Sequence, residues 1–213
     1  LSNNPSSNNP LLNEPSSNNP LKDAYNTSKV LPIDPNLEDQ WAKYYNQAAD
    51  AYGNENFEKA VIYFDKANAL WPSDTNTIIN GGYAAVQAEQ WEKAKSNFYR
   101  AIEFGSMDKD IRLILLYVVY NAQNQPYEAL SIIRDARAIY PSDNELARQE
   151  INILIQLDRV EEAINPLQLA IINEPNDPNL FFTLGILYEE LAINHSNDAR
   201  KSQAINMAKQ AYL

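Results

Sequence analysis

The sequence predicts an all-α fold: a right-handed superhelical solenoid of about five helix-turn-helix units, preceded by an extended N-terminal tail. One observation is a motif that returns about every 34 residues, most plainly at Trp41–Asp74, Asp110–Asp143 and Asn144–Asp177. A second is the helical spacing of the apolar residues within each copy. A period of this length is typical of helix pairs that stack into a curved surface. We therefore expect function in a groove rather than in a catalytic pocket.

The first 36 residues are predicted to form the tail. Residues 1–20 consist mainly of Asn, Ser and Pro, and the heptapeptide Pro-Ser-Ser-Asn-Asn-Pro-Leu occurs at Pro5–Leu11 and again at Pro15–Leu21. Regularly placed prolines disfavour a helix, and the apolar residues are too few to offset the entropy lost on ordering. We expect an extended segment that lies against its own solenoid or a neighbouring molecule. Its natural anchors are Leu11, Leu12 and Leu21.

Residues 37–213 are predicted to form the solenoid. A short helix at Leu21–Val30 would precede it, and Asp34-Pro35 has the pattern of an N-cap followed by proline in the first helical turn. The last unit contains a long connection, Ala192–Arg200, which carries the single histidine, His195. The predicted units cover about 41–74, 75–109, 110–143, 144–177 and 178–213.

The second half of each unit repeats an alanine, a large apolar residue, an alanine and a closing proline. These residues are Ala60, Phe64, Ala67 and Pro72; Ala94, Phe98 and Ala101; Ala129, Ile133, Ala136 and Pro141; and Ala163, Leu167, Ala170 and Pro175. The first halves carry a small residue at the helix crossing in three units, as Ala48, Gly82 and Gly185, but Tyr117 and Ile151 in the other two. In this pattern the chain resembles the tetratricopeptide-repeat (TPR) family. Unit two lacks the proline, and its exit Gly105–Asp108 is expected to be one residue longer than the others.

Composition excludes several classes of protein. The net charge is −11, and the segment from Pro141 to Glu190 contains ten acidic residues but only two basic ones, Arg148 and Arg159. Nucleic acid is therefore not expected as a partner. Acidic solvent-facing surfaces explain this charge, and a site for a basic ligand is the minor alternative. The absence of cysteine excludes disulfides and thiolate metal sites, and the longest apolar run, Leu113–Val119, is too short to cross a membrane.

No catalytic, metal or cofactor site is predicted, and the protein is not expected to be an enzyme. One histidine and no cysteine supply too few ligands for a typical metal centre, so His195 is interpreted as a solvated loop residue. Adjacent acidic pairs such as Glu161-Glu162 point in different directions on a helix and do not share a site. Gly81-Gly82 lacks the surrounding pattern of a phosphate loop and is assigned to helix packing. A small-molecule substrate is likewise not expected.

The resemblance implies a concave groove lined by the first helix of each unit. Mapped onto this chain, its floor is apolar and aromatic in units one to three, with Ile111, Ile114 and Val118 in the third. Ile114, Val118 and Ile186 are as consistent with sealing one repeat to the next. Of the residues with which some family members clamp a terminal carboxylate, only Asn80 is matched. The predicted partner-binding residues are Tyr45, Tyr52, Asn76, Ile79, Asn80, Tyr83, Val86, Asn121, Arg148, Asn152 and Phe182.

These features predict a non-catalytic scaffold that binds a peptide or helical segment of another protein. Two alternatives stay open: structural self-association through the tail or the open C-terminal end, and a role as the regulatory part of a larger enzyme. Because the chain starts at Leu1, we expect it to be a processed or shortened form. Its Asn-rich, cysteine-free composition is also similar to envelope repeat proteins of the Bacteroidetes. That likeness favours the periplasm or cell envelope, with a cytoplasmic location still open.

Overall fold

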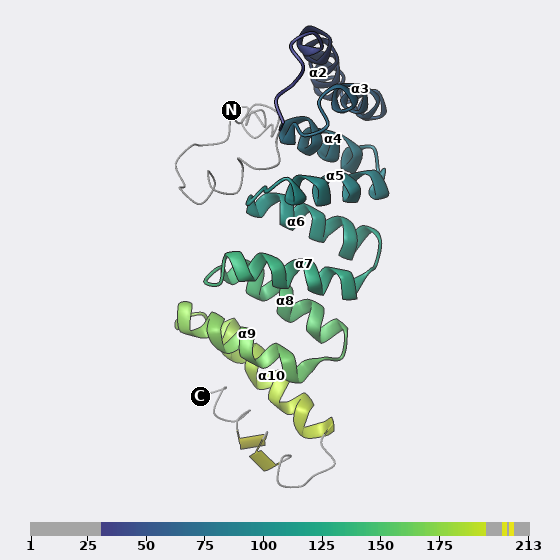
Figure 1. The fold of residues 1–213 in the computed structure, drawn as a ribbon. Helices are drawn as coiled ribbons and strands as arrows, with labels where there is room; N and C mark the ends of the chain where they lie inside the picture. Colours follow the sequence, from purple (N-terminus) through teal and green to yellow (C-terminus); the bar gives the residue numbers. More distant parts are fainter. Residues whose placement is uncertain (1–30, 195–201, 204, 207–213) are drawn as a thin grey trace, which may run out of the picture. The chain divides into compact units, whose positions relative to one another are not determined.

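The computed structural model describes residues 31–194, 202–203 and 205–206 (Figure 1). These residues form α-helices joined by short turns, and none of them forms a β-strand, so the all-α prediction is confirmed. No helix within these ranges combines the length and apolar character needed to cross a membrane. Residues 1–30 of the predicted tail, including the helix expected at 21–30, lie outside the described ranges, as do most of the fifth unit's connection with His195 and the unit's final residues.

The chain divides into two compact units, Leu1–Val118 and Val119–Leu213. In the first, each helix packs against the next one along the chain, which gives two complete helix pairs and the first helix of a third (Figure 1). Its helices are α2 (Glu38–Gly53), α3 (Phe57–Leu70), α4 (Thr75–Gln87), α5 (Trp91–Glu103) and α6 (Lys109–Tyr117).

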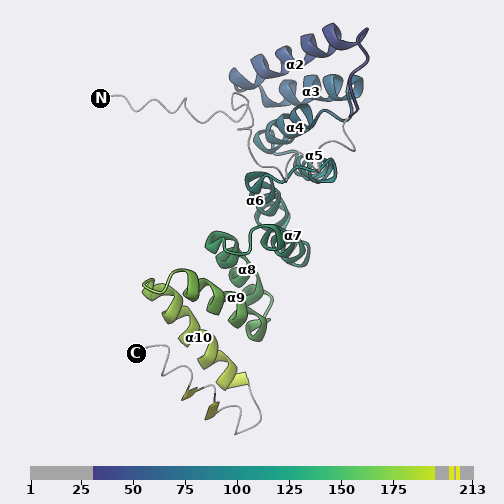
Figure 2. The same ribbon diagram turned by 60° about the vertical axis from the view of Figure 1, so that its left-hand side comes forward.

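The second unit is built in the same way. Helix α7 packs against α8, α8 against α9, and α9 against α10 (Figure 2). A π-helical turn, Val118–Ala122, follows α6 directly. The α-helices of this unit are α7 (Pro126–Ile139), α8 (Asn144–Gln156), α9 (Val160–Asn173) and α10 (Pro178–Asn194). Helix α10 therefore includes the first three residues of the connection predicted to start at Ala192.

The turns repeat the same local chemistry. At the start of α4, α6 and α8, an aspartate N-cap accepts a hydrogen bond from a backbone N–H two or three residues later, which fixes where each helix begins. Within each complete pair, one residue of the turn has a left-handed conformation, with φ between 52 and 58°. The caps are Asp74, Asp108 and Asp143, and the turn residues are Glu55, Glu89, Asn124 and Asp158.

The third helix pair contains one extra residue, which lies in its first helix. Fifteen residues separate the cap Asp74 from the turn residue Glu89, but sixteen separate Asp108 from Asn124. A π-helix accommodates an extra residue within a helical segment, and the turn at Val118–Ala122 occurs in this interval. The helix therefore absorbs the insertion without a longer loop.

The exit from α5 is one residue longer than the others, as predicted: five residues, 104–108, separate α5 from α6, whereas four separate α3 from α4, α7 from α8 and α9 from α10. Seven residues lead from Ala101 to the cap Asp108, the same number as from Ala67 to the cap Asp74. Helix α5 has 13 residues and α3 has 14, so the longer exit leaves the spacing of the caps unchanged. Gly105 adopts φ 94°, a left-handed conformation that glycine tolerates without strain.

Small residues lie where helices cross, as the repeat pattern predicts. Gly82 of α4 is the tightest case, because a Cβ atom there would stand 2.8 Å from Cε1 of the fully buried Phe98. This also confirms Gly81-Gly82 as a packing feature inside a helix. Eight alanines of the second helices are at most 1% exposed: Ala60, Ala67, Ala94, Ala101, Ala129, Ala136, Ala163 and Ala170.

The crossing residue of the third pair is Leu116 rather than Tyr117. Leu116 stands eight residues after its cap Asp108, as Gly82 does after Asp74, and it is 4% exposed. Tyr117 is 45% exposed. The expectation that Tyr117 occupies the crossing is therefore wrong, and its side chain belongs to the surface of α6.

Candidate functional site

The first helices of the unit Leu1–Val118 carry tyrosines whose rings rest on aromatic residues of the second helices. Tyr45 packs on Phe64, Tyr52 on Phe57, Tyr83 on Phe98 and Tyr117 on Trp91, with centroids 5.3 to 6.4 Å apart and planes 69 to 77° apart. Edge-to-face contacts of this kind favour one ring orientation. The four tyrosines are thus held in place by the fold before any ligand arrives.

We use the name tyrosine face for the side chains at repeating positions on these first helices. Ile79 and Leu113 stand 34 residues apart, as do Tyr83 and Tyr117. Apart from the more exposed Tyr117, the members are half-buried, so each still presents part of its surface to solvent. The tyrosine face consists of Tyr45, Tyr52, Ile79, Tyr83, Val86, Leu113 and Tyr117, none of which carries a charge at neutral pH.

Hydrogen bonds join α2 to α4 at one end of this face. Nδ2 of Asn80 donates to the Tyr45 hydroxyl at 2.7 Å, and Nε1 of Trp41 donates to Oγ1 of Thr77 at 3.2 Å. Asn80 is only 6% exposed, so its amide positions Tyr45 rather than meeting solvent. Burial raises the pKa of the Tyr45 phenol, while the hydrogen bond from Asn80 acts in the opposite direction.

Tyr83 of α4 is half-buried in the tyrosine face. Burial, with smaller contributions from the negative charges of Asp108 and Asp110, raises the pKa of Tyr83 to about 12. Burial also raises the pKa of Tyr52. Both phenols therefore stay protonated at any physiological pH, and each offers an apolar ring together with a hydroxyl that can donate a hydrogen bond.

Helix α4 contributes the centre of the face and contains no charged residue. Ile79 and Val86 are half-buried, whereas Asn76 near the helix start is exposed. An uncharged helix of this kind offers dispersion and hydrogen bonding but no ion pairs to a ligand.

The third pair presents different residues from those predicted. Ile111 and Val118 are at most 1% exposed and belong to the core. Asn121 is exposed, but it lies in the π-helical turn one residue beyond the place equivalent to Val86, which Tyr120 occupies. Sequence reasoning missed Leu113 and Tyr117. The signal was present in the cap spacing, which is 34 residues from Asp74 to Asp108 but 35 from Asp108 to Asp143.

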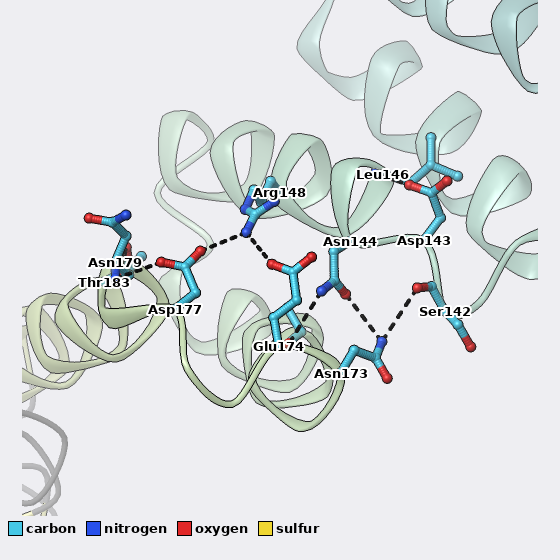
Figure 3. A network of polar contacts seen from close by, with 11 residues as sticks. Ser142, Asp143, Asn144, Leu146, Arg148, Asn173, Glu174, Asp177, Asn179 and Thr183 are labelled. Carbon is cyan, nitrogen blue, oxygen red and sulfur yellow. Dashed lines mark hydrogen bonds and ion pairs between the residues drawn. The ribbon is translucent and has the colours of Figure 1, made fainter.

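In the unit Val119–Leu213, the predicted site residues come from α8 and α10. Nη2 of Arg148 lies 2.6 Å from Oε2 of Glu174 and 2.8 Å from Oδ2 of Asp177 (Figure 3). These carboxylates raise the pKa of the Arg148 guanidinium. Arg148 therefore links α8 to the turn between α9 and α10. Asn152 is exposed, and Phe182 on α10 is 59% exposed.

A further ionic cluster in this unit has no counterpart in the sequence predictions. Glu150 of α8 is only 5% exposed and pairs with Arg134 at 2.9 Å and with Arg137, both on α7. Arg134 also contacts Glu162 of α9 at 2.9 Å, and Arg159 holds Glu162 at 2.6 Å. The cluster ties three consecutive helices together, and the arginines lower the pKa of Glu162.

The described residues offer no group of three or more histidine, aspartate or glutamate side chains that could hold a metal ion. The chemistry that the tyrosine face supports is recognition: apolar contact, aromatic stacking and hydrogen bonding. Arg148 and Glu150, in contrast, are engaged in pairs that stabilise the fold.

The sequence resembles one curated repeat protein. No protein-family model matches the chain. The TPR repeat-containing protein YpiA of Bacillus subtilis (strain 168) is 25% identical over 130 residues, which cover 61% of this chain. The match spans only 30% of YpiA's own length. Its source gives no support to the likeness to envelope proteins of the Bacteroidetes.

Solved structures show the same fold. YrrB, described as a TPR protein with an unusual peptide-binding site, matches with a TM-score of 0.55 and 23% identity over 79% of this chain and 84% of its own. The MamA protein matches with a TM-score of 0.59 and 13% identity over 80% of this chain and 89% of its own. A MamA fragment from Desulfovibrio magneticus RS-1 gives 0.56 and 15%, over 81% and 93%. The chain therefore folds as a tetratricopeptide-repeat solenoid, as its repeating motif predicts.

Proposed function

We propose that this protein is a non-catalytic scaffold that binds an extended, uncharged segment of a partner protein on the tyrosine face. The observation that carries the proposal is the support beneath each tyrosine ring. Because the four rings already rest on Phe64, Phe57, Phe98 and Trp91, little side-chain freedom is lost when a ligand covers them. Tyrosines held in this way are typical anchors of protein interfaces.

The chemistry of the face selects the partner. The tyrosine face has no charged member, and the charges that act on Tyr83, those of Asp108 and Asp110, are negative. An acidic peptide is therefore disfavoured, and the face itself offers a charged side chain no ion pair. Phenol hydroxyls and the exposed amide of Asn76 can bond to a peptide backbone, while Ile79, Val86 and Leu113 take apolar side chains. A TPR protein with a peptide-binding site among the structural neighbours supports this choice.

An array of uncharged peptides containing leucine, proline and aromatic residues tests the proposal on the full chain. Binders are then measured by calorimetry against Tyr117→Ala and Tyr83→Phe. Tyr117→Ala removes an exposed ring and should weaken binding at least tenfold, whereas Tyr83→Phe keeps the ring and should weaken it less. Tyr127→Ala is the matched control, because Tyr127 is 72% exposed on α7 and lies outside the face.

The salt dependence separates this site from an ionic one. Binding to an uncharged face should change less than twofold between about 0.05 and 0.5 M salt, because screening acts only on charges. Equal affinity of wild type and Tyr117→Ala for every peptide of the array would rule out the tyrosine face as the binding site.

A further inference from the structure

Leu31, the first residue that the structure describes, is held by hydrogen bonds to the turn between α3 and α4. The backbone N–H of Leu31 donates to Oγ of Ser73 at 3.0 Å. Its carbonyl accepts from that hydroxyl at 3.0 Å and from Nε1 of Trp71 at 2.6 Å. Both partners follow directly after α3 and precede α4. Leu31, to which the chain before it is joined, is therefore tethered to this turn.

This tether lies beside the tyrosine face. Trp71, which holds the Leu31 carbonyl, packs edge-on against Trp41 with centroids 5.3 Å apart. Trp41 in turn packs on Tyr45, again at 5.3 Å. Two ring contacts thus separate the entry point from Tyr45, the nearest member of the face.

The chain before Leu31 is long enough to cover the face. Leu21 stands ten residues before Leu31 and Leu11 ten residues earlier, and an extended segment spans about 3.1 Å per residue. Leu21 reaches about 15 Å from the tether if residues 21–30 form the predicted helix, and Leu11, ten extended residues further, reaches about 31 Å beyond it. Helix α2 is about 24 Å long at 1.5 Å per residue, so the segment 11–21 can extend along it. A tethered segment of this length acts at an effective concentration in the millimolar range.

The composition of this segment matches the face. Residues 1–21 contain one charged side chain, Glu14, and prolines at every fifth position from Pro5 to Pro20. Aromatic-lined surfaces take proline-rich extended segments because such segments lose little entropy on binding. Each copy of the heptapeptide ends in a leucine, Leu11 or Leu21, which supplies the apolar side chain that an Ile- and Tyr-lined surface needs.

We propose that residues 5–21 bind the tyrosine face of their own chain and compete there with the partner segment. This proposal rests on the proposed function, because it assigns a resident occupant to the same surface. The partner then binds only after displacing the N-terminal segment, and anything that removes or captures this segment exposes the scaffold.

A spin label tests the intramolecular contact in the full chain. The natural chain has no cysteine, so Ser16→Cys gives one unique attachment site for a nitroxide. The label should broaden the methyl signals of Ile79 and Leu113 at least fivefold more than that of Ile172, which is 71% exposed in the other unit. Adding Leu11→Asp, Leu12→Asp and Leu21→Asp should abolish the difference. Equal broadening at Ile79 and Ile172 in the labelled Ser16→Cys chain would overturn the proposal.

A mixing experiment identifies which copy is bound. Spin-labelled chain without isotopes is mixed with isotope-labelled, cysteine-free chain. Broadening at Ile79 should stay below one tenth of the intramolecular value at 50 μM. Comparable broadening would mean that the segment binds a second copy, which overturns binding in cis.

A binding assay separates failure of this proposal from failure of the proposed function. The probe is a fluorescent synthetic peptide, Pro-Ser-Ser-Asn-Asn-Pro-Leu. It should bind the chain carrying the three leucine-to-aspartate changes at least tenfold more tightly than wild type, because the competitor is gone. Equal affinity for both chains would overturn the proposal. The proposed function would still be judged separately, by the peptide array and Tyr117→Ala.

Discussion

The first helices of the two compact units use equivalent positions in opposite ways. In α4 and α6 these positions hold Ile79, Tyr83, Leu113 and Tyr117, whose rings and side chains rest on aromatic and apolar neighbours. In α8 the position equivalent to Leu113 holds Arg148, which is engaged by two carboxylates (Figure 3). Equivalent positions of the repeat therefore hold packed, uncharged side chains in one unit and an ion-paired arginine in the other.

The difference teaches that repeat position alone does not define a binding site. A side chain at a given repeat position can contact a ligand only when its neighbours hold it in place without occupying its hydrogen-bonding groups. Tyrosine does this through packing of its ring, which does not use the hydroxyl's capacity to donate a hydrogen bond. Arg148, in contrast, donates its hydrogen bonds to the carboxylates of Glu174 and Asp177. Substitutions that remove one kind of support should therefore change the free energy of unfolding in different ways in the two units.

The ionic character of the second unit is tested most strongly at Glu150. Replacing it by alanine removes a buried carboxylate between Arg134 and Arg137 and should cost about 3 to 5 kcal/mol, because positive charge is left unpaired in a partly buried place. Urea unfolding measures the loss, and hydrogen exchange should speed up in α7 to α9 while α2 to α5 stay unchanged. Glu161→Ala, on the exposed surface of α9, is the control and should change stability by less than about 0.5 kcal/mol. A loss below 1 kcal/mol for Glu150→Ala would show that the cluster contributes little.

The packing character of the first unit is tested at Gly82. Alanine there places a Cβ atom 2.8 Å from the Phe98 ring and should destabilise the protein by about 1 to 3 kcal/mol through overpacking. Gly53→Ala, with no atom within 4 Å of the new Cβ, should show no loss. Thermal unfolding of the two variants makes the comparison. Equal melting temperatures would contradict the close approach of α4 and α5.

The two kinds of support should respond differently to salt. Arg148→Gln breaks exposed pairs with Glu174 and Asp177 and should cost about 0.5 to 1 kcal/mol at low salt, and almost nothing near 1 M. Asn80→Ala removes the buried hydrogen bond to Tyr45 and should cost about 1 kcal/mol at both salt concentrations. Denaturation curves at two ionic strengths check both variants. If the stability loss of Asn80→Ala depended strongly on salt, the two units would not differ in the kind of interaction that supports them.

The smallest effect is confined to alkaline pH. The pKa of Tyr83 in the folded protein, about 12, lies above the ordinary value of 10, so the unfolded chain releases its proton first as the pH rises. The contribution of this phenol to stability is fully present below pH 10 and is lost between pH 10 and 12. Tyr83→Phe should therefore lose less stability over this range than wild type. Parallel pH profiles for Tyr83→Phe and wild type would show that Tyr83 is not buried.

Much of the scaffold was predictable because it depends on local patterns. The alanine positions of the second helices fix where helices cross, and those eight residues are buried as expected. Gly82 was identified as a packing glycine from its place in the repeat, and its contact with Phe98 gives the reason. Tyr45, Tyr52 and Tyr83 were chosen by mapping the groove positions of the tetratricopeptide-repeat family onto the chain, and the structure holds all three half-buried on first helices.

The all-α repeat, its helix pairs and the uncharged composition of α4 were predictable from the sequence, because spacing and residue type set helical faces directly. Only the tertiary structure decided how the extra residue of the third pair is absorbed. A longer loop and a π-helical turn have the same length in sequence, and burial of Val118 and Val119 favours the turn. Likewise, the sequence pattern predicts Arg148 as a partner-binding residue. Its pairing with Glu174 and Asp177 depends on acids 26 and 29 residues away, which only the folded chain brings within hydrogen-bonding distance.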